Sequence, residues 1–191
     1  MKKMILPIVI WCVFVPSLWA QAISIEADFS IVFSQDGAET TQQMLPIYGY
    51  GFSRARNRQM AQMEATANAN SMIAMQSGGN PFQYTTSNGS TAFSVGSSQS
   101  TSAVRVMSAV PAGGSLCVTA SADTMVDYSS ANFMEIHLEQ QLLVDGPMDG
   151  LIQGALNGMM QEAVIQAIEE SGLQDRDVSG TLYLKGLNIN F

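Results

Sequence analysis

Histidine chemistry in this chain rests on one residue, His137, because the sequence contains a single histidine. A metal centre built from several histidines is therefore excluded. A serine–histidine–aspartate arrangement needs only one histidine, yet the Gly-x-Ser-x-Gly turn that presents a nucleophilic serine in many hydrolases is absent. We expect His137 to be an outward-facing strand residue between Glu135 and Glu139, with no catalytic role.

Carboxylates are the most abundant ionisable groups, since Asp and Glu together number 16. Catalysis by carboxylates alone requires two of them to converge in a cleft. The acidic pairs here fall at a predicted helix end and in a turn (Glu169 and Glu170, Asp175 and Asp177). Neither a phosphate-binding Gly-Lys-Ser/Thr loop nor a dinucleotide fingerprint is present. The sequence thus predicts no catalytic residue, no metal site and no cofactor, and we expect the protein not to be an enzyme.

Cys117 is the only cysteine outside the N-terminal apolar run, which holds Cys12. One thiol cannot form a disulfide within the chain or a cysteine-rich metal site. Because Cys117 stands between Leu116 and Val118, a buried thiol is the expectation. The alternative is a disulfide between two chains, which an oxidising compartment would allow.

Residues 1–22 have the order of a cleavable secretory signal peptide. Lys2 and Lys3 precede an apolar run over residues 4–15, and Ala20 and Ala22 supply the small residues that a signal peptidase accepts. The run is shorter than the roughly 20 residues that a membrane-spanning helix needs. We therefore expect export in a bacterium, to the periplasm, the outer membrane or the exterior. A single domain over residues 23–191, with no transmembrane segment, would remain after cleavage.

The exported chain is expected to be strongly acidic. Cleavage removes Lys2 and Lys3, which leaves six basic against 16 acidic residues and a net charge of −10. Nucleic acids and anionic lipids bind basic surfaces, so neither is expected as a partner.

Alternating apolar residues predict several β-strands. The alternation is clearest over residues 23–33, and further strands are expected at 44–50 and 180–191. Two more, at 103–110 and 116–126, flank a Pro-Ala-Gly-Gly sequence that suits a hairpin turn. Residues 132–144 are compatible with a strand or a helix, because the alternation up to residue 139 gives way to consecutive apolar residues at 142–144.

Two segments have the periodicity of helices. The first runs from residue 53 to about 76, with Ala61, Ala65 and Ala69 forming a narrow stripe that lets a helix lie close to a sheet. The second covers residues 147–171 and carries glycines at every fourth position (Gly150, Gly154 and Gly158), which predicts close approach of another backbone. We expect an α+β fold, an antiparallel sheet with both helices packed on one face.

Two groups of residues are candidates for binding a partner. Residues 76–102 form an uncharged insert rich in Gly, Ser, Thr and Asn, either a long loop or a segment that pairs with another chain. Its aromatic residues are Phe82, Tyr84 and Phe93. The second group is Arg54, Arg56 and Arg58, which oppose the helix dipole if they lie in a first turn. Either acidic neighbours in the same fold or a partner would favour arginines there.

Residues 47–61, with the sequence IYGYGFSRARNRQMA, lead into an alanine-rich helix. This layout resembles the LPP20-like domains of bacterial envelope lipoproteins and flagellar outer-membrane accessory proteins, in which a strand with alternating glycines enters an Ala-Arg-x-x-Ala helix. LYLKGL at 182–187 is similar to a late strand of such domains. Ala61 falls two residues late for the family spacing, and a lipidation motif is missing. The resemblance implies a non-catalytic part of an envelope or flagellar assembly.

These observations predict a periplasmic or cell-envelope structural protein that binds envelope or appendage proteins, its own copies included. The alternative is a periplasmic carrier that holds a small apolar ligand or lipid in a pocket lined by methionines. The chain has 13 methionines, and this flexible side chain suits adaptable apolar sites.

Overall fold

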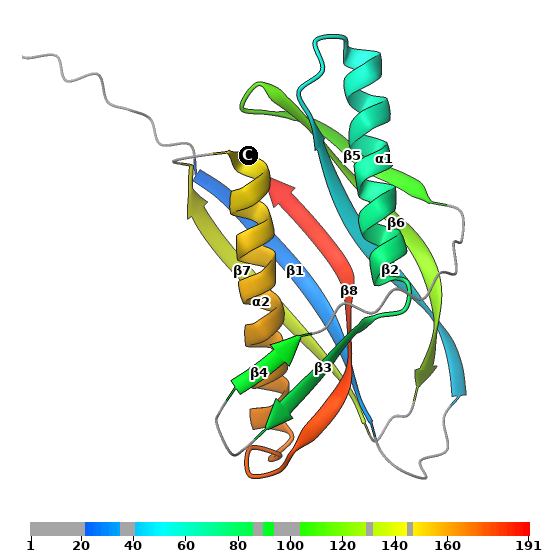
Figure 1. Cartoon of the computed structure of the whole chain (residues 1–191), viewed down its shortest axis with the longest axis vertical. Coiled ribbons are helices and arrows are strands. Elements are labelled where there is room, and N and C mark those ends of the chain that lie inside the picture. Colours follow the sequence, from blue (N-terminus) through cyan, green and yellow to red (C-terminus); the bar gives the residue numbers. More distant parts are fainter. Residues whose placement is uncertain (1–21, 35–40, 86–89, 94–103, 129–131, 145–146) are drawn as a thin grey trace, which may run out of the picture.

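The structure is a computed structural model that describes residues 22–34, 41–85, 90–93, 104–128, 132–144 and 147–191. Within these residues, two helices and eight strands follow one another (Figure 1). Their bounds, in chain order, are β1 Ala22–Phe33, β2 Thr41–Ser53, α1 Arg58–Gln76, β3 Asn80–Thr85, β4 Ser90–Phe93, β5 Arg105–Ala112, β6 Ser115–Tyr128, β7 Phe133–Leu143, α2 Met148–Glu170 and β8 Val178–Asn190. All strand pairs are antiparallel, in a five-stranded sheet ordered β4-β3-β8-β1-β7 and a three-stranded sheet ordered β2-β6-β5.

Strand β1 lies inside the five-stranded sheet and confirms the predicted alternation. Its odd-numbered residues from Ile23 to Phe33 are all buried, and they share one core with α2 residues such as Ile152 and Met159. Each large apolar side chain buried in this way stabilises the fold by about 1.5–3 kcal/mol. Helix α2 packs chiefly against β7 and β1. The opposite face of the same strands carries the charged residues.

Helix α1 packs on the three-stranded sheet, against β2 and β6. The predicted alanine stripe (Ala61, Ala65 and Ala69) is buried there. Gly49 and Gly51 of β2 face it so closely that a Cβ at Gly51 would lie 2.1 Å from the carbonyl oxygen of Ala65. Small residues on both elements therefore permit this contact, as the sequence predicted.

The two helices do not share one face of one sheet, so that part of the predicted arrangement is wrong. The α and β elements and the antiparallel pairing are present, but each helix covers its own sheet. Period-two alternation shows that a strand has one buried face, and it does not show which strands pair. The two helices bury different side chains: mainly alanines on α1, and on α2 three alanines together with six larger apolar residues, so they fit different surfaces.

Two local predictions, the hairpin turn and the second helix, are confirmed, and the alternative left open at residues 132–144 is decided. The β5–β6 hairpin turns at Gly113 and Gly114, both with positive φ (50° and 82°). Residues 133–143 form a strand, because they pair with β1 along its whole length. Helix α2 runs from residue 148 to residue 170, with Gly172 at φ 66° just beyond it.

The uncharged insert was expected to be a long loop or a segment that pairs with another chain, but residues 80–85 and 90–93 form strands in a sheet of this chain. Strand β3 pairs with β8 and β4 pairs with β3. Phe82 is 2 % exposed and packs edge-on against Phe33, with ring centroids 6.2 Å apart. The absence of charge in this segment thus reflects burial in a sheet. The rest of the insert, at 86–89 and 94–103, lies outside the described residues, as does the predicted signal peptide up to residue 21.

The glycines of α2 do not pack against another backbone within the described part of the chain, which corrects a second expectation. A Cβ placed on Gly150, Gly154 or Gly158 would meet nothing within 4 Å, and all three residues are exposed. The apolar residues between them, such as Ile152 and Leu156, make the contact with the sheet.

Candidate functional site

Arg54, Arg56 and Arg58, here called the arginine tip, lie where β2 passes into α1. The helix begins at Arg58 and not at residue 53 as predicted, because Asn57 caps it: the Asn57 side chain accepts a hydrogen bond from the backbone N–H of Gln59 at 2.9 Å. Arg54 and Arg56 therefore belong to the connecting segment, and only Arg58 belongs to the first turn.

The segment that carries the arginine tip is anchored by Ser53. Its hydroxyl donates to Glu64 Oε2 at 2.6 Å and accepts a hydrogen bond from the backbone N–H of Ala55 at 3.1 Å. Asn68 Nδ2 also donates to the carbonyl oxygen of Phe52 at 2.9 Å. Contacts from two successive turns of α1 thus tie down the end of β2. The arginine tip therefore follows a segment that hydrogen bonds hold in place.

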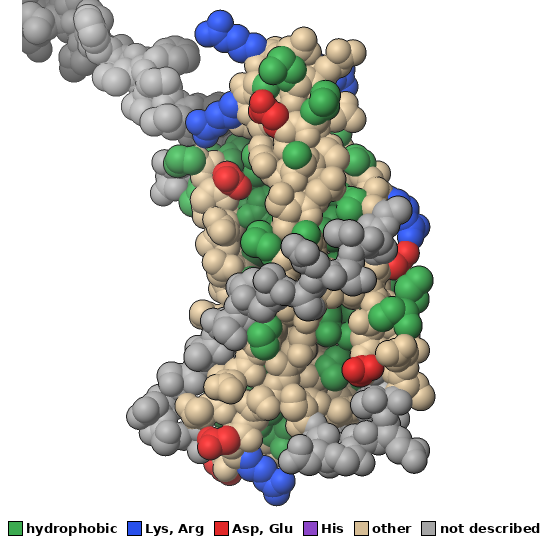
Figure 2. All heavy atoms as spheres, turned by 45° about the vertical axis from the view of Figure 1, so that its right-hand side comes forward, with side chains coloured by type: hydrophobic (Ala, Val, Ile, Leu, Met, Phe, Trp, Pro, Cys, Tyr) green, Lys and Arg blue, Asp and Glu red, His purple; other side chains and the backbone are tan. Residues whose placement is uncertain are grey.

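The arginine side chains themselves have no partner among the residues that the structure describes. Ion pairs join Arg105 to Asp123, Lys185 to Glu135 and His137 to Asp28, and none of them includes the arginine tip. All three arginines are exposed, and basic side chains gather at the end where α1 begins (Figure 2). Glu64 lies near this segment through its hydrogen bond with Ser53, but no ion pair joins a carboxylate to the arginine tip in the described part of the chain.

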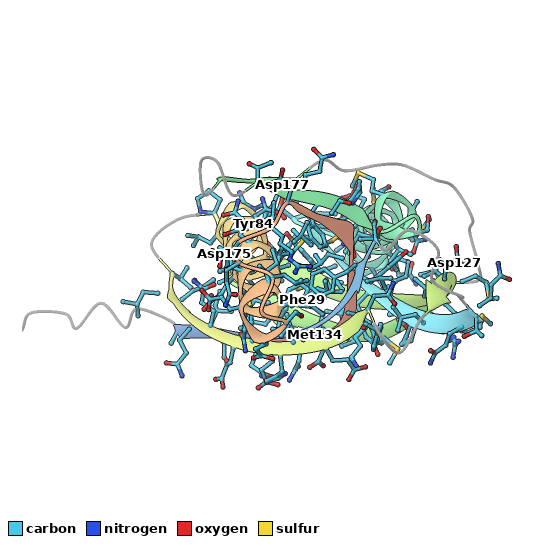
Figure 3. The ribbon with its side chains drawn as sticks, turned by 90° about the horizontal axis from the view of Figure 1, so that it is seen from below. Phe29, Tyr84, Asp127, Met134, Asp175 and Asp177 are labelled. Carbon is cyan, nitrogen blue, oxygen red and sulfur yellow. The ribbon has the colours of Figure 1, made fainter. Side chains whose placement is uncertain are left out.

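The aromatic candidates of the insert lie elsewhere. Figure 1 shows β3 and β4 at the end of the molecule opposite the start of α1. Phe82 is part of the core and is not accessible to a partner in this fold. Tyr84 is half-buried against the same core and lies on the side of Asp175 and Asp177 (Figure 3). Phe93 pairs with Phe82 across β3 and β4, and its side chain is outside the described residues.

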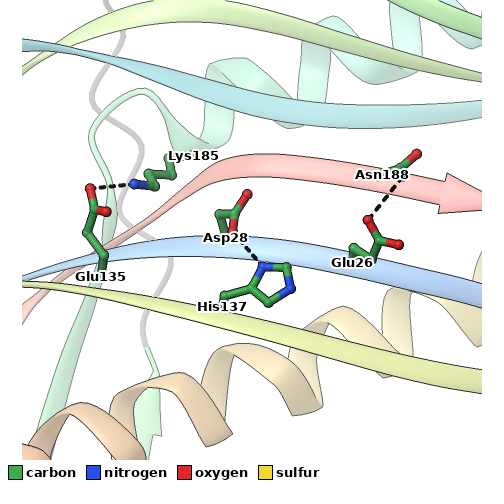
Figure 4. A network of polar contacts seen from close by, with 6 residues as sticks. All are labelled: Glu26, Asp28, Glu135, His137, Lys185 and Asn188. Carbon is green, nitrogen blue, oxygen red and sulfur yellow. Dashed lines mark hydrogen bonds and ion pairs between the residues drawn. The ribbon is translucent and has the colours of Figure 1, made fainter.

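His137 lies on the solvent face of the five-stranded sheet, as predicted. Its Nδ1 is 2.7 Å from Asp28 Oδ1, in a row of polar contacts that crosses β7, β1 and β8 (Figure 4). Asn188 donates to Glu26 at 3.1 Å in the same row. The hydrogen bond and negative charge of Asp28 raise the pKa of His137 above 6.5. Within the described residues, no group of three or more His, Cys, Asp or Glu side chains is arranged to hold a metal ion.

Cys117 is buried, which confirms the expected environment of the thiol. Burial, with the negative charge of Asp149 as a smaller cause, raises the pKa of Cys117 to about 12. The same two causes raise the pKa of the neighbouring Tyr50 hydroxyl. A protonated, enclosed thiol is a poor nucleophile, so this residue acts as core.

Methionines divide between the interior and the surface. Met148 and Met159 of α2 are part of the core, whereas six others expose at least half of their surface (Met44, Met60, Met63, Met75, Met107 and Met125). A hollow of about 550 Å³ follows the outer side of α1, with Met63 as its one methionine among Gln59, Gln62, Thr66, Ala67 and Asn70. The exposed methionines are a surface feature that the sequence pattern did not reveal.

Comparisons of the chain with protein-family models, curated proteins and solved structures found no match. The resemblance to LPP20-like domains therefore stays a prediction. Among the described residues, no helix is long and apolar enough to cross a membrane.

Proposed function

We propose that this chain is a non-catalytic structural or accessory protein of the bacterial cell envelope, which works by binding other proteins through its arginine tip. Flagellar and other appendage proteins are among the partners that the resemblance to LPP20-like domains implies. Export by the predicted signal peptide would bring the protein to the periplasm or the outer membrane.

The observation that carries this proposal is the concentration of unpaired positive charge at one end of an acidic protein. Of the six basic residues beyond the predicted signal, three lie within five positions of the chain, and no described carboxylate neutralises them. Arg58 also begins a helix with no acidic residue in its first turn, where a cation is unfavourable by about 0.3–1 kcal/mol. Charges that cost stability in the isolated protein are explained by a partner with an acidic surface.

The experiment compares co-purification of partners with the native protein and with a triple variant, Arg54→Gln, Arg56→Gln and Arg58→Gln. The matched control is Arg176→Gln, which removes an exposed arginine from the turn between α2 and β8. We expect the triple variant to lose the partner and the control to keep it. Equal recovery from all three proteins would contradict the proposal.

A carrier makes a different prediction for the same preparations. Native mass spectrometry would then find a small apolar ligand or lipid retained by the purified protein, with no dependence on the arginines. The assembly proposal predicts protein masses alone, lost at high salt because exposed charge pairs are screened.

A further inference from the structure

The described strands leave four sheet edges, β4, β7, β2 and β5, and three of them have features that discourage pairing. Strand β4 has only four residues, β2 contains Pro46, and β5 contains Pro111 and an irregularity in register between Val106 and Ser108. Short length, proline and bulges are three of the means by which proteins protect an edge from other strands.

Strand β7 lacks these three protections, although it carries the exposed ionisable residues Glu135, His137 and Glu139. It has 11 residues without proline or glycine, and its register with β1 is continuous. No described strand pairs with its outer side. Figure 1 shows it at the margin of the molecule away from β2, β5 and β6. Leu143, at its end, is 69 % exposed. An unbroken edge of this length is a template for another strand.

The side chains of β7 match a second copy of β7 in one particular register. Antiparallel pairing of all 11 residues places Leu138 opposite itself on a twofold axis, and directly opposed residues then share a face of the sheet. On the solvent face His137 comes opposite Glu139 of the other copy, twice by symmetry. Glu139 already lies opposite Glu26 of β1, and a cationic neighbour on its open side offsets that repulsion.

The same register covers exposed apolar surface. Leu143 comes opposite the half-buried Phe133 of the other copy, and on the α2 face Met134 comes opposite Leu142. A shift by two residues towards the N-terminus would instead put His137 opposite itself and Glu135 opposite Glu139. The register with the greatest overlap is therefore also the one with complementary charges.

Helix α2 fits beside its own copy in this arrangement. It lies chiefly over β7 and β1, so two such helices would be separated by two strand spacings, about 10 Å. That is close to the 8–10 Å between packed helices. The exposed glycines of α2 (Gly150, Gly154 and Gly158) have no side chains, so they leave room on this side of the helix for the second copy.

We propose that two copies of this chain associate through their β7 strands, antiparallel and centred on Leu138, to form one continuous sheet with five strands from each copy. This inference rests on the proposed function of assembly by protein contact and assigns a surface to self-association. It does not involve the arginine tip, which stays free at the start of α1 in both copies.

The first test measures the mass of the exported protein by analytical ultracentrifugation, together with Leu143→Glu and Met63→Glu. Both positions are highly exposed (69 % and 74 %), so neither change removes core packing. We expect a dimer for the native protein, a dissociation constant at least about tenfold weaker for Leu143→Glu, and a change within about twofold for Met63→Glu on α1. A native monomer, or equal effects of the two variants, would overturn the proposal.

The second test fixes the register by cysteine cross-linking. Leu138→Cys places two thiols opposite one another, about 4.5–5.5 Å apart between Cα atoms, within disulfide range. Gln140→Cys places them about 14 Å apart, out of range. We expect a disulfide dimer only from the first variant, since Cys117 is buried. Cross-linking of the second alone would contradict the register.

Partner binding through the arginine tip and self-association through β7 can be refuted independently of each other. The triple arginine variant is expected to remain a dimer while losing its partner, and Leu143→Glu is expected to bind the partner as a monomer. A native monomer that pairs β7 with a strand of a different protein would refute self-association and leave the proposed function intact.

Discussion

The contact between Gly51 and α1 gives a prediction whose size follows from the structure. In Gly51→Ala the new Cβ would lie 2.1 Å from Ala65 O, 2.6 Å from Ala69 N and 2.8 Å from Asn68 Cβ. All three atoms belong to α1, and two of them are backbone atoms, so no side chain can rotate away. The helix must move by about 1 Å to restore ordinary contact, and overpacking of this kind costs about 1–3 kcal/mol.

The assay is urea unfolding of a protein comprising residues 23–191, with Gly154→Ala as the matched control. Gly154 is an exposed helix residue whose Cβ would meet nothing within 4 Å, so alanine there should stabilise the protein by about 0.5–1 kcal/mol. We expect the unfolding midpoint to fall for Gly51→Ala and to rise for Gly154→Ala. A Gly51→Ala protein as stable as the native one would refute the close approach of α1 to β2.

Three further predictions concern single side chains. Phe82→Ala should destabilise the protein by about 3–5 kcal/mol in thermal or urea unfolding, because the ring is enclosed against Phe33. An effect below about 1 kcal/mol would show that the Phe82 ring is not buried. His137 should titrate above 6.5 by NMR and return towards 6.5 in Asp28→Asn. Because the pKa of His137 is raised in the folded state, the protonated side chain stabilises the fold; this contribution is complete below pH 6.5 and is lost as the pH rises through the folded-state pKa. An unchanged titration of His137 in Asp28→Asn would contradict the contact between His137 and Asp28. Cys117 should resist thiol reagents at pH 8 until the protein unfolds, whereas rapid labelling of the native protein would show that it is accessible.

Much of the fold was predictable because local patterns determine local structure. The alternation in β1, the glycine turn between β5 and β6, and the alanine stripe of α1 each follow from the residues themselves. The pairing of strands was not predictable, since β3 joins β8 across about 100 residues of sequence and no local pattern encodes such a partner. The uncharged insert was misassigned for the same reason: Phe82 stands between Pro81 and Gln83 with no strand pattern around it, and only the neighbouring β8 and Phe33 make its position a core position.

The candidate site was predictable in composition and not in geometry. The sequence showed that Arg54, Arg56 and Arg58 are close together, but the Asn57 cap moves the helix start past the first two of them. Their lack of a described ionic partner is a tertiary property, as is the open edge of β7. The sequence can also suggest a contact that is absent: the spacing of the α2 glycines indicated close packing of another backbone, and the described chain has none there.

The most direct test of the central claim is site-specific photo-crosslinking in the cell that makes the protein. A photoreactive residue at Met60, exposed on the first turn of α1 and close in sequence to Arg58, keeps all three arginines in place. Met44, exposed near the start of β2 and so at the other end of this strand from the arginine tip, serves as the control position. We predict a discrete cross-linked envelope protein at Met60, lost when the three arginines are replaced by glutamine and absent at Met44. No product at Met60, or one that persists without the arginines, would contradict the claim.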